Sequence, residues 1–162
     1  HRGGADRARP GADRRGARRY AETEMLCYRA AERRLAARQA AAWDPWLAWA
    51  ARTLDAPLRV TTGVMPVAQP AEALQALHRE VARQAPLTLA ALGVAVPALG
   101  SLVLGLAVAA GLLSPEEAHR LATIDEAFQE ELWGSDAEAL ARRAAVSEEV
   151  ALAARLVGLA AG

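Results

Sequence analysis

The chain has 162 residues, an apolar fraction of 53% and a formal net charge of zero. This length suggests one domain with its own core, and the neutral charge argues against a nucleic-acid-binding protein, which would carry a basic footprint. Only 4% of residues are aromatic, so alanine, leucine and valine must form the core, and this composition favours helix. The single cysteine, Cys27, excludes an internal disulfide and a cysteine-based metal cluster, and it fits a reducing compartment.

Residues 1–19 are rich in arginine and glycine and contain almost no large apolar side chain. Such a segment cannot offset the conformational entropy lost on ordering. We therefore expect disorder or a frayed helix over residues 1–19 and an ordered helical domain over residues 20–162. An arginine-rich start is also typical of a mitochondrial presequence, but Asp6, Asp13 and the missing amphipathic face argue against that alternative.

The next elements are two helices, a short strand and a third helix. Residues 32–43 form the first predicted helix. Asp44 and Pro45 are predicted to end it and to begin a second helix, because aspartate is a good N-cap and proline is tolerated at the first helical position. Residues 58–62 are rich in β-branched side chains and predict one short strand. A lone strand cannot form a sheet, so it is either a connector or an edge strand whose neighbour is absent. Residues 71–83 form the third predicted helix, which is amphipathic.

Residues 85–113 contain no charged side chain and are long enough to span a membrane. Pro97 removes a helical hydrogen bond in the middle of this run, so two shorter helices are predicted, over residues 87–96 and 98–110. Helices that are apolar all round belong inside a protein, and we expect a helical bundle around a buried apolar hairpin at residues 86–112. A membrane-associated helical protein anchored by residues 85–113 is the alternative.

The C-terminal third contains residues that are typical of helix starts and helix ends. Ser114 predicts a capping box with the glutamate three residues later, at the start of a helix over residues 115–133 that ends at Gly134. Ser135 with Glu138 predicts a second capping box and a last helix that reaches about residue 160.

One face of the predicted helix over residues 115–133 carries an unusual group of side chains. At 100° per residue, Glu126, Glu130 and Trp133 fall together, with Gln129 at the edge. Glutamates at i and i+4 repel each other by about a few tenths of a kcal/mol, and tryptophan is enriched at interface hot spots. The spacing fits a partner-binding face, but it also fits a solvated acidic face with the tryptophan folded back onto the next helix. Paired carboxylates for acid–base catalysis would need a concave site and shifted pKa values.

We find no sequence motif for enzyme chemistry. His78 and His119 lie on different predicted helices without a partner carboxylate motif, and Cys27 has the context of a small buried hydrophobe. Phosphate-binding glycine loops, zinc-ligand spacings and nucleophile elbows do not occur. We expect a protein that is not an enzyme and holds no cofactor or metal.

Four stretches of the sequence together resemble the ATP12 family. In chain order they read LCYRA, LAARQAAAWDPWLAWAA, LRVTTGVMP and SLVLGLAVAAGLLSPEEAHRLATIDEAFQEELWGSDAE. They follow one another as they do in the family, and the resemblance covers residues 20–143. The unit of Trp43, Asp44 and Pro45 and the acidic run that ends at Trp133 and Gly134 are the strongest matches.

Members of the family are assembly chaperones for the F1 part of ATP synthase. They bind the free F1 α subunit and keep it from aggregating until a β subunit replaces them. The resemblance implies such a chaperone here, acting as a monomer without nucleic acid or a membrane span. The family occurs in mitochondria and in α-proteobacteria, and the all-arginine, alanine-rich composition suggests the bacterial case and the cytoplasm.

The family fold joins an N-terminal β-rich domain to a C-terminal helical domain, and this chain corresponds mainly to the helical one. The first nineteen residues do not resemble the β-rich domain. The WDP unit, Trp43 to Pro45, is expected to hold two helices at a fixed angle. By position, the resemblance implies partner binding by Asp125, Glu126, Gln129, Glu130, Trp133 and Gly134.

Overall fold

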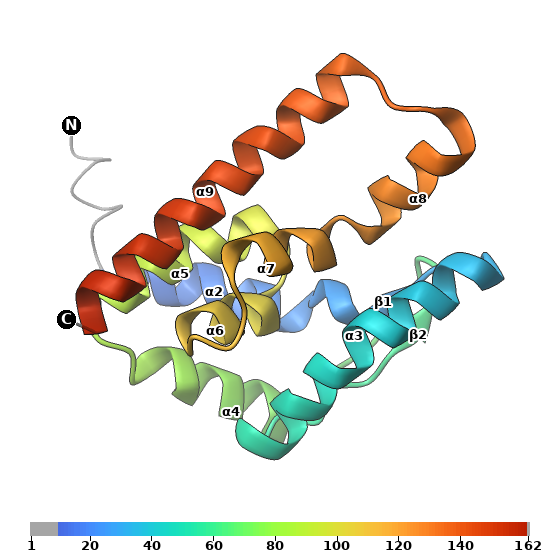
Figure 1. Cartoon of the computed structure of the whole chain (residues 1–162). Helices are drawn as coiled ribbons and strands as arrows, with labels where there is room; N and C mark the ends of the chain where they lie inside the picture. The colour runs from blue at the N-terminus through green and yellow to red at the C-terminus, as the bar shows by residue number, and fades with distance from the viewer. Residues whose placement is uncertain (1–9, 162) are drawn as a thin grey trace.

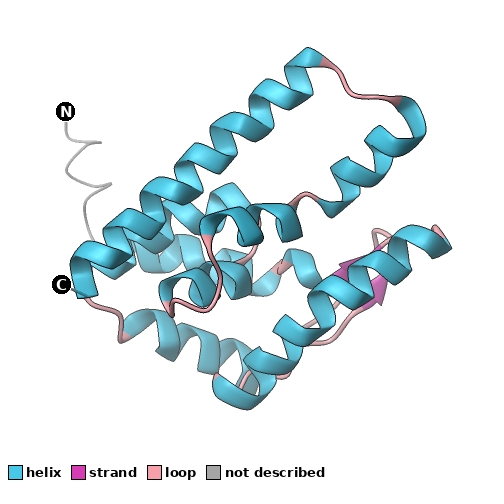
Figure 2. Ribbon diagram, viewed as in Figure 1, coloured by secondary structure: helices cyan, strands magenta, loops and turns pink. Residues whose placement is uncertain are grey.

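The fold is a set of helices arranged around two central apolar ones (Figures 1 and 2). The computed structural model describes residues 10–161, with side chains described for residues 16–160. The predicted fold class, mostly helical with very little strand, is confirmed. In chain order the elements are α2 (Pro10–Glu22), the 3-10 helix η1 (Met25–Cys27), β1 (Tyr28–Arg29), α3 (Arg33–Thr53), β2 (Thr61–Thr62), α4 (Ala71–Ala82), α5 (Pro86–Leu99), α6 (Leu102–Ala109), α7 (Pro115–Ala122), α8 (Ile124–Trp133) and α9 (Ala137–Ala161).

Helices α5 and α6 form the predicted buried hairpin. Residues 102–108 of α6 are all buried, and α5 is covered by α2, α6 and α9. Each fully buried leucine or valine contributes about 1.5–3 kcal/mol relative to exposure, so this hairpin is the main source of hydrophobic stabilisation. No helix within residues 10–161 has both the length and the hydropathy that crossing a membrane requires.

The break between the two hairpin helices lies at Gly100, not at Pro97 as predicted. Pro97 occupies the last turn of α5, where it removes only one helical hydrogen bond. Gly100 has φ 71°, the left-handed conformation that ends helices. Ser101 then begins α6, because its hydroxyl oxygen accepts a hydrogen bond from the backbone N–H of Leu104 at 3.0 Å.

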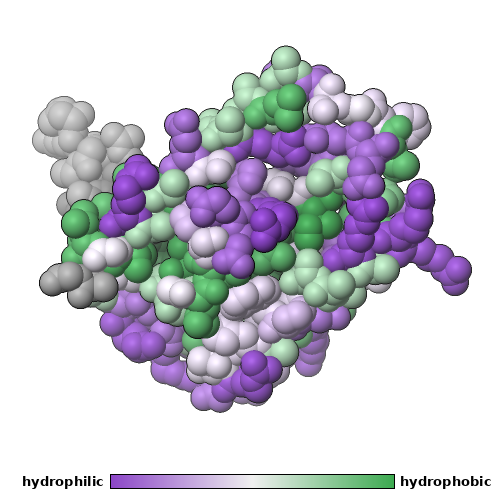
Figure 3. Space-filling model, in the orientation of Figure 1, coloured by the Kyte–Doolittle hydropathy of each residue, from purple (hydrophilic) through white to green (hydrophobic). Residues whose placement is uncertain are grey.

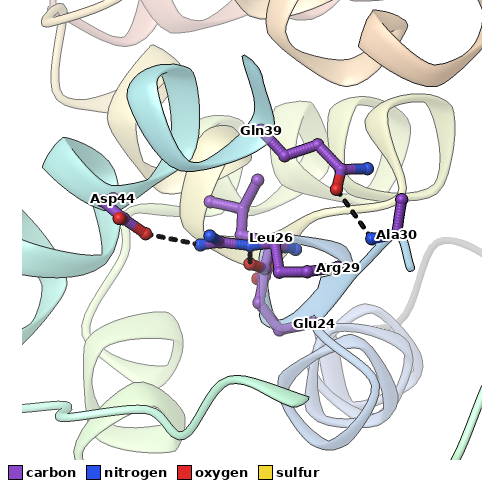
Figure 4. Close-up of polar contacts among 6 residues, drawn as sticks. All are labelled: Glu24, Leu26, Arg29, Ala30, Gln39 and Asp44. Atoms are coloured by element: carbon purple, nitrogen blue, oxygen red, sulfur yellow. Dashed lines mark hydrogen bonds and ion pairs between the residues drawn. The ribbon is translucent and has the colours of Figure 1, made fainter. Parts of the chain in front are cut away.

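Helix α3 is continuous through Pro45, so the prediction that Asp44 and Pro45 start a new helix is wrong. Asp44 caps nothing. Its Oδ1 instead accepts a hydrogen bond from Nη2 of the buried Arg29 at 2.7 Å. Arg29 also donates through Nε to the carbonyl oxygen of Leu26 at 2.8 Å (Figure 4). This ion pair fixes Asp44 inside a helix, so local capping preference does not decide its conformation.

The other polar contacts of α3 tie it to its neighbours. Gln39 is buried and its Oε1 accepts from the backbone N–H of Ala30 at 2.8 Å (Figure 4). Trp43 donates through Nε1 to the carbonyl oxygen of Leu121 at 2.8 Å. The WDP unit, Trp43 to Pro45, therefore lies within one helix and has a structural role, since it joins α3 to α7 and to the segment around β1.

The predicted strand at residues 58–62 is shorter than expected and it has a partner. Only Thr61 and Thr62 form strand β2, which pairs in parallel with β1, Tyr28 opposite Thr61. The side chain of Gln69 holds the chain two residues before the strand, since it exchanges two hydrogen bonds with the backbone of Arg59, at 2.8 and 3.1 Å. The neighbour that the sequence did not reveal lies about thirty residues upstream.

Helix α2 begins ten residues before the point where order was expected. It covers residues 10–19 of the segment predicted to be disordered or a frayed helix, whereas residues 1–9 lie outside the described residues. Ala17 and Ala21 are buried, where α2 meets α4 and α5. Small side chains let helices approach closely, so this packing needs none of the large apolar residues that the sequence argument required.

Two of the signals in the C-terminal third differ from prediction. The capping box at Ser114 is confirmed, but the helix over residues 115–133 is divided at Thr123, whose hydroxyl donates to the carbonyl oxygen of His119 at 2.9 Å. Helix α9 begins one residue later than predicted. Asp136 is its N-cap and accepts from the N–H of Ala139 at 2.7 Å, so the proposed box of Ser135 with Glu138 is wrong.

Candidate partner-binding site

Helices α8 and α9 diverge from a short turn (Figure 1). Residues of both helices line an open groove. We call it the acidic groove, and its volume is about 380 Å³. The space-filling view shows hydrophilic side chains gathered along the space between these helices (Figure 3). The structure brings all six residues predicted for partner binding to this groove, which is lined by Asp125, Glu126, Gln129, Glu130, Trp133, Gly134, Ser135, Asp136, Ala139 and Arg142.

The sequence around the turn explains why the groove forms. Gly134 has φ 82° and its N–H bonds the carbonyl oxygen of Glu130 at 2.8 Å, which ends α8. Two residues later Asp136 caps α9. Because the connection is so short, the two helices remain neighbours and their facing side chains line one concave surface.

Trp133, the last residue of α8, is 81% exposed. The interpretation that this side chain folds back onto the next helix is therefore wrong. A large aromatic group left in water next to a groove is the kind of residue that anchors protein interfaces. The role of Trp133 in binding stays a prediction, but its exposure removes the strongest alternative.

Arg143 of α9 reaches both glutamates of the groove. Its Nε lies 3.6 Å from Oε2 of Glu126, and its Nη2 pairs with Oε2 of Glu130. Arg143 is only 17% exposed, while Glu126 remains 55% exposed. A guanidinium between two carboxylates offsets the repulsion expected from their i, i+4 spacing, so the acidic face is held in place and not merely solvated.

The groove still carries excess negative charge. Four carboxylates and the guanidinium of Arg142 line it, with Arg143 beside them, so the local net charge is −2. Arg142 is 66% exposed and its nearest acidic partner, Glu138, is 3.4 Å away and also exposed. Exposed pairs of this kind are weak, so Arg142 is free to move and the groove attracts cationic groups.

The opposite side of α8 fastens the helix to α3. Phe128 is buried, and the guanidinium groups of Arg34 and Arg38 lie over its ring, 5.5 and 5.0 Å from the centroid. Arg38 also pairs with both carboxylate oxygens of Glu131, and this hydrogen bonding lowers the pKa of Glu131. The sequence analysis missed these contacts, which fix the direction of the acidic groove.

The remaining candidate residues do not form a chemical site. Cys27 is fully buried, and burial raises the pKa of its thiol to about 12, so the residue is a small hydrophobe as predicted. His78 and His119 lie apart on α4 and α7, and burial lowers the pKa of His78. Among residues 16–160, no three His, Cys, Asp or Glu side chains are arranged so that they could hold a metal ion.

The chain is similar to solved structures over nearly its whole length, although no family model matches it. The crystal structure of Atp12 from Paracoccus denitrificans has a TM-score of 0.89 and 44% identity, over 91% of this chain and 64% of that chain. A point mutant of the same protein gives 0.89 and 43%, over 92% and 64%. A proposed chaperone from Agrobacterium tumefaciens gives 0.83 and 41%, over 91% and 56%.

These proteins are similar to this chain in both fold and sequence, because identities above 40% accompany the high TM-scores. The protein class that results is a helical domain similar to that of bacterial Atp12. The predicted resemblance to the ATP12 family is confirmed. The chain spans 64% of the length of the Paracoccus Atp12 chain.

Proposed function

We propose that this chain is an assembly chaperone, not an enzyme, and that it binds the free F1 α subunit of ATP synthase through the acidic groove. One observation supports this most directly. The residues that the family resemblance implies for partner binding, which were chosen from sequence alone, line a single open groove beside an exposed tryptophan.

The chemistry of the groove suits temporary protection of a subunit. An unassembled subunit exposes an interface that aggregates unless it is covered. Trp133 offers a large apolar contact, and truncating such an anchor typically costs about 2 kcal/mol or more of binding free energy. The surrounding charges speed association and choose the partner more than they add affinity, so the subunit remains displaceable.

Release by the β subunit follows from the displaceable character of this binding. We expect the β subunit to bind the same surface of the α subunit more tightly and so to displace the chaperone by mass action. We expect this exchange to occur in the bacterial cytoplasm with the chaperone as a monomer.

Aggregation of the isolated F1 α subunit tests the proposal. Light scattering of the α subunit is followed alone, with this chain, and with an unrelated helical protein as control. We expect only this chain to suppress scattering, and we expect added β subunit to release it from the complex. Equal suppression by the control protein, or aggregation that continues in the presence of this chain, would contradict the proposal.

A further inference from the structure

A second groove opens beside the acidic one. It lies where η1, the end of α5, the α7–α8 junction and α9 meet, and its volume is about 390 Å³. We call it the apolar groove, because its walls are mainly apolar: Met25, Pro97, Ala98, Ala122 and Val146. The sequence keeps this space open with small residues where the helices meet.

Gly100 is the residue that makes this opening most difficult to fill by mutation. Its φ of 71° disfavours any side chain, and a Cβ there would lie 3.7 Å from Sδ of Met25. Met25 itself is only partly buried. A flexible thioether that borders a groove adapts to apolar side chains of different shapes, so the apolar groove suits a variable hydrophobic ligand group.

The two grooves are neighbours that share lining residues. Glu126 and Arg142 line both of them, and Arg143 lies at the junction, held by Glu126 and Glu130. A segment that places one side chain beside Glu126 in the acidic groove can therefore place a neighbouring side chain in the apolar groove.

We propose that the two grooves bind one segment of a protein partner that carries a basic side chain next to a large aliphatic one. This inference rests on the proposed function, and it specifies what the α subunit must present. The net charge of −2 in the acidic groove favours arginine or lysine and disfavours a carboxylate. The apolar walls favour leucine, isoleucine or methionine, since an aliphatic side chain packed against Met25, Ala122 and Val146 removes apolar surface from water.

Short synthetic peptides provide the direct test. One labelled peptide carries arginine beside leucine, a second carries glutamate in place of arginine, and a third carries serine in place of leucine. Binding to the whole chain is measured by fluorescence anisotropy. We expect the arginine–leucine peptide to bind at least tenfold more tightly than either of the others. Equal binding of all three peptides would overturn the inference.

Matched alanine-to-leucine variants locate the site. Ala98→Leu and Ala122→Leu each fill the apolar groove, whereas Ala90→Leu makes the same change at an exposed position of α5 outside it. We expect the first two to weaken the arginine–leucine peptide at least tenfold while Ala90→Leu leaves it unchanged, with helical circular dichroism retained in all three. Equal affinities in Ala98→Leu, Ala122→Leu and Ala90→Leu would overturn the inference.

Binding measurements with the isolated α subunit distinguish this inference from the proposed function. If the wild-type chain fails to bind the isolated α subunit but binds the arginine–leucine peptide in a manner that Ala98→Leu abolishes, the proposed function falls and the joined grooves stand. If α-subunit binding is strong and neither Ala98→Leu nor Ala122→Leu weakens it, the inference alone falls. Self-association that Ala98→Leu abolishes would identify a second copy as the occupant and would also overturn it.

Discussion

The α5–α6 hairpin and the acidic groove use the same helical framework in opposite ways. The two hairpin helices contain no charged side chain, and residues 102–108 are all buried. The groove carries four carboxylates and leaves Trp133 81% exposed. Burying such a side chain would contribute about 1.5–3 kcal/mol, so this stabilisation is available for binding and is not used in folding. Hydrophobic stabilisation and the proposed recognition therefore depend on different surfaces of the fold.

The largest expected effect on stability comes from truncating a buried side chain of the α5–α6 hairpin. Leu104 is fully buried, whereas Leu140 on α9 is 48% exposed. Leu104→Ala should lower the free energy of unfolding by about 2–5 kcal/mol, because the lost contacts leave a cavity. Leu140→Ala should change it by less than about 0.5 kcal/mol. Urea titration of both variants measures the difference, and similar losses would mean that the hairpin is not the stabilising centre.

A buried carboxyl group gives the hairpin its pH dependence. Glu24 is fully buried, and its carboxylate oxygens accept hydrogen bonds from the N–H groups of Leu26 and Val103 at 3.2 and 2.9 Å. Burial raises its pKa to about 7, against a lowering contribution from hydrogen bonds such as that of Ser101. The folded state thus holds the proton more tightly than the unfolded state, whose pKa is 4.5.

Stability should consequently fall as the pH rises from about 4.5 to about 7, by about 3 kcal/mol. Glu24→Gln cannot ionise and should lose this slope. Urea unfolding at several pH values across this interval measures both proteins. A wild-type stability that rises with pH in this interval, or a slope that persists in Glu24→Gln, would show that burial does not control this group.

Substituting alanine for two helical glycines should change the stability in opposite directions. A Cβ on Gly105 in α6 would lie 2.7 Å from Cγ2 of Val96, whereas a Cβ on Gly158 in α9 meets nothing within 4 Å. Gly105→Ala should destabilise by about 1–3 kcal/mol through overpacking. Gly158→Ala should stabilise by up to about 1 kcal/mol through helix propensity. Thermal melts measure both changes. A higher melting temperature in both variants would mean that α5 and α6 can separate at little cost.

The smallest expected effect on stability comes from the ion pair that links α8 to α3. Glu131→Gln removes an exposed ion pair with Arg38, and exposed pairs contribute little. We expect only a slight decrease in melting temperature, which disappears at high salt because screening weakens the wild-type pair as well. A large decrease would show that α8 depends on this contact for its position.

Local signals predicted much of the fold. The absence of charge over residues 85–113 indicated the buried hairpin, and Ser114 and Gly134 gave helix ends that the structure confirms. The acidic face with Trp133 was visible because helical spacing alone brings its residues together. Each of these features depends on residues that are close in sequence.

The errors arise where distant residues decide the outcome. Asp44 stays within α3 because its carboxylate pairs with Arg29, fifteen residues away. Strand β2 acquires a neighbour from residues 28–29. Arg143 was missed as the counter-charge of the acidic face because it lies on the next helix, across a turn whose geometry the sequence does not specify.

The central claim is that the acidic groove binds the α subunit, and the affinity of Trp133→Ala tests it most directly. Leu132→Ala is the matched control, since Leu132 is the adjacent residue, is 46% exposed and does not line the groove. Titration of each variant with the isolated F1 α subunit should show at least about a tenfold loss for Trp133→Ala and little change for Leu132→Ala. Wild-type affinity in Trp133→Ala, or equal losses in both variants, would contradict the claim.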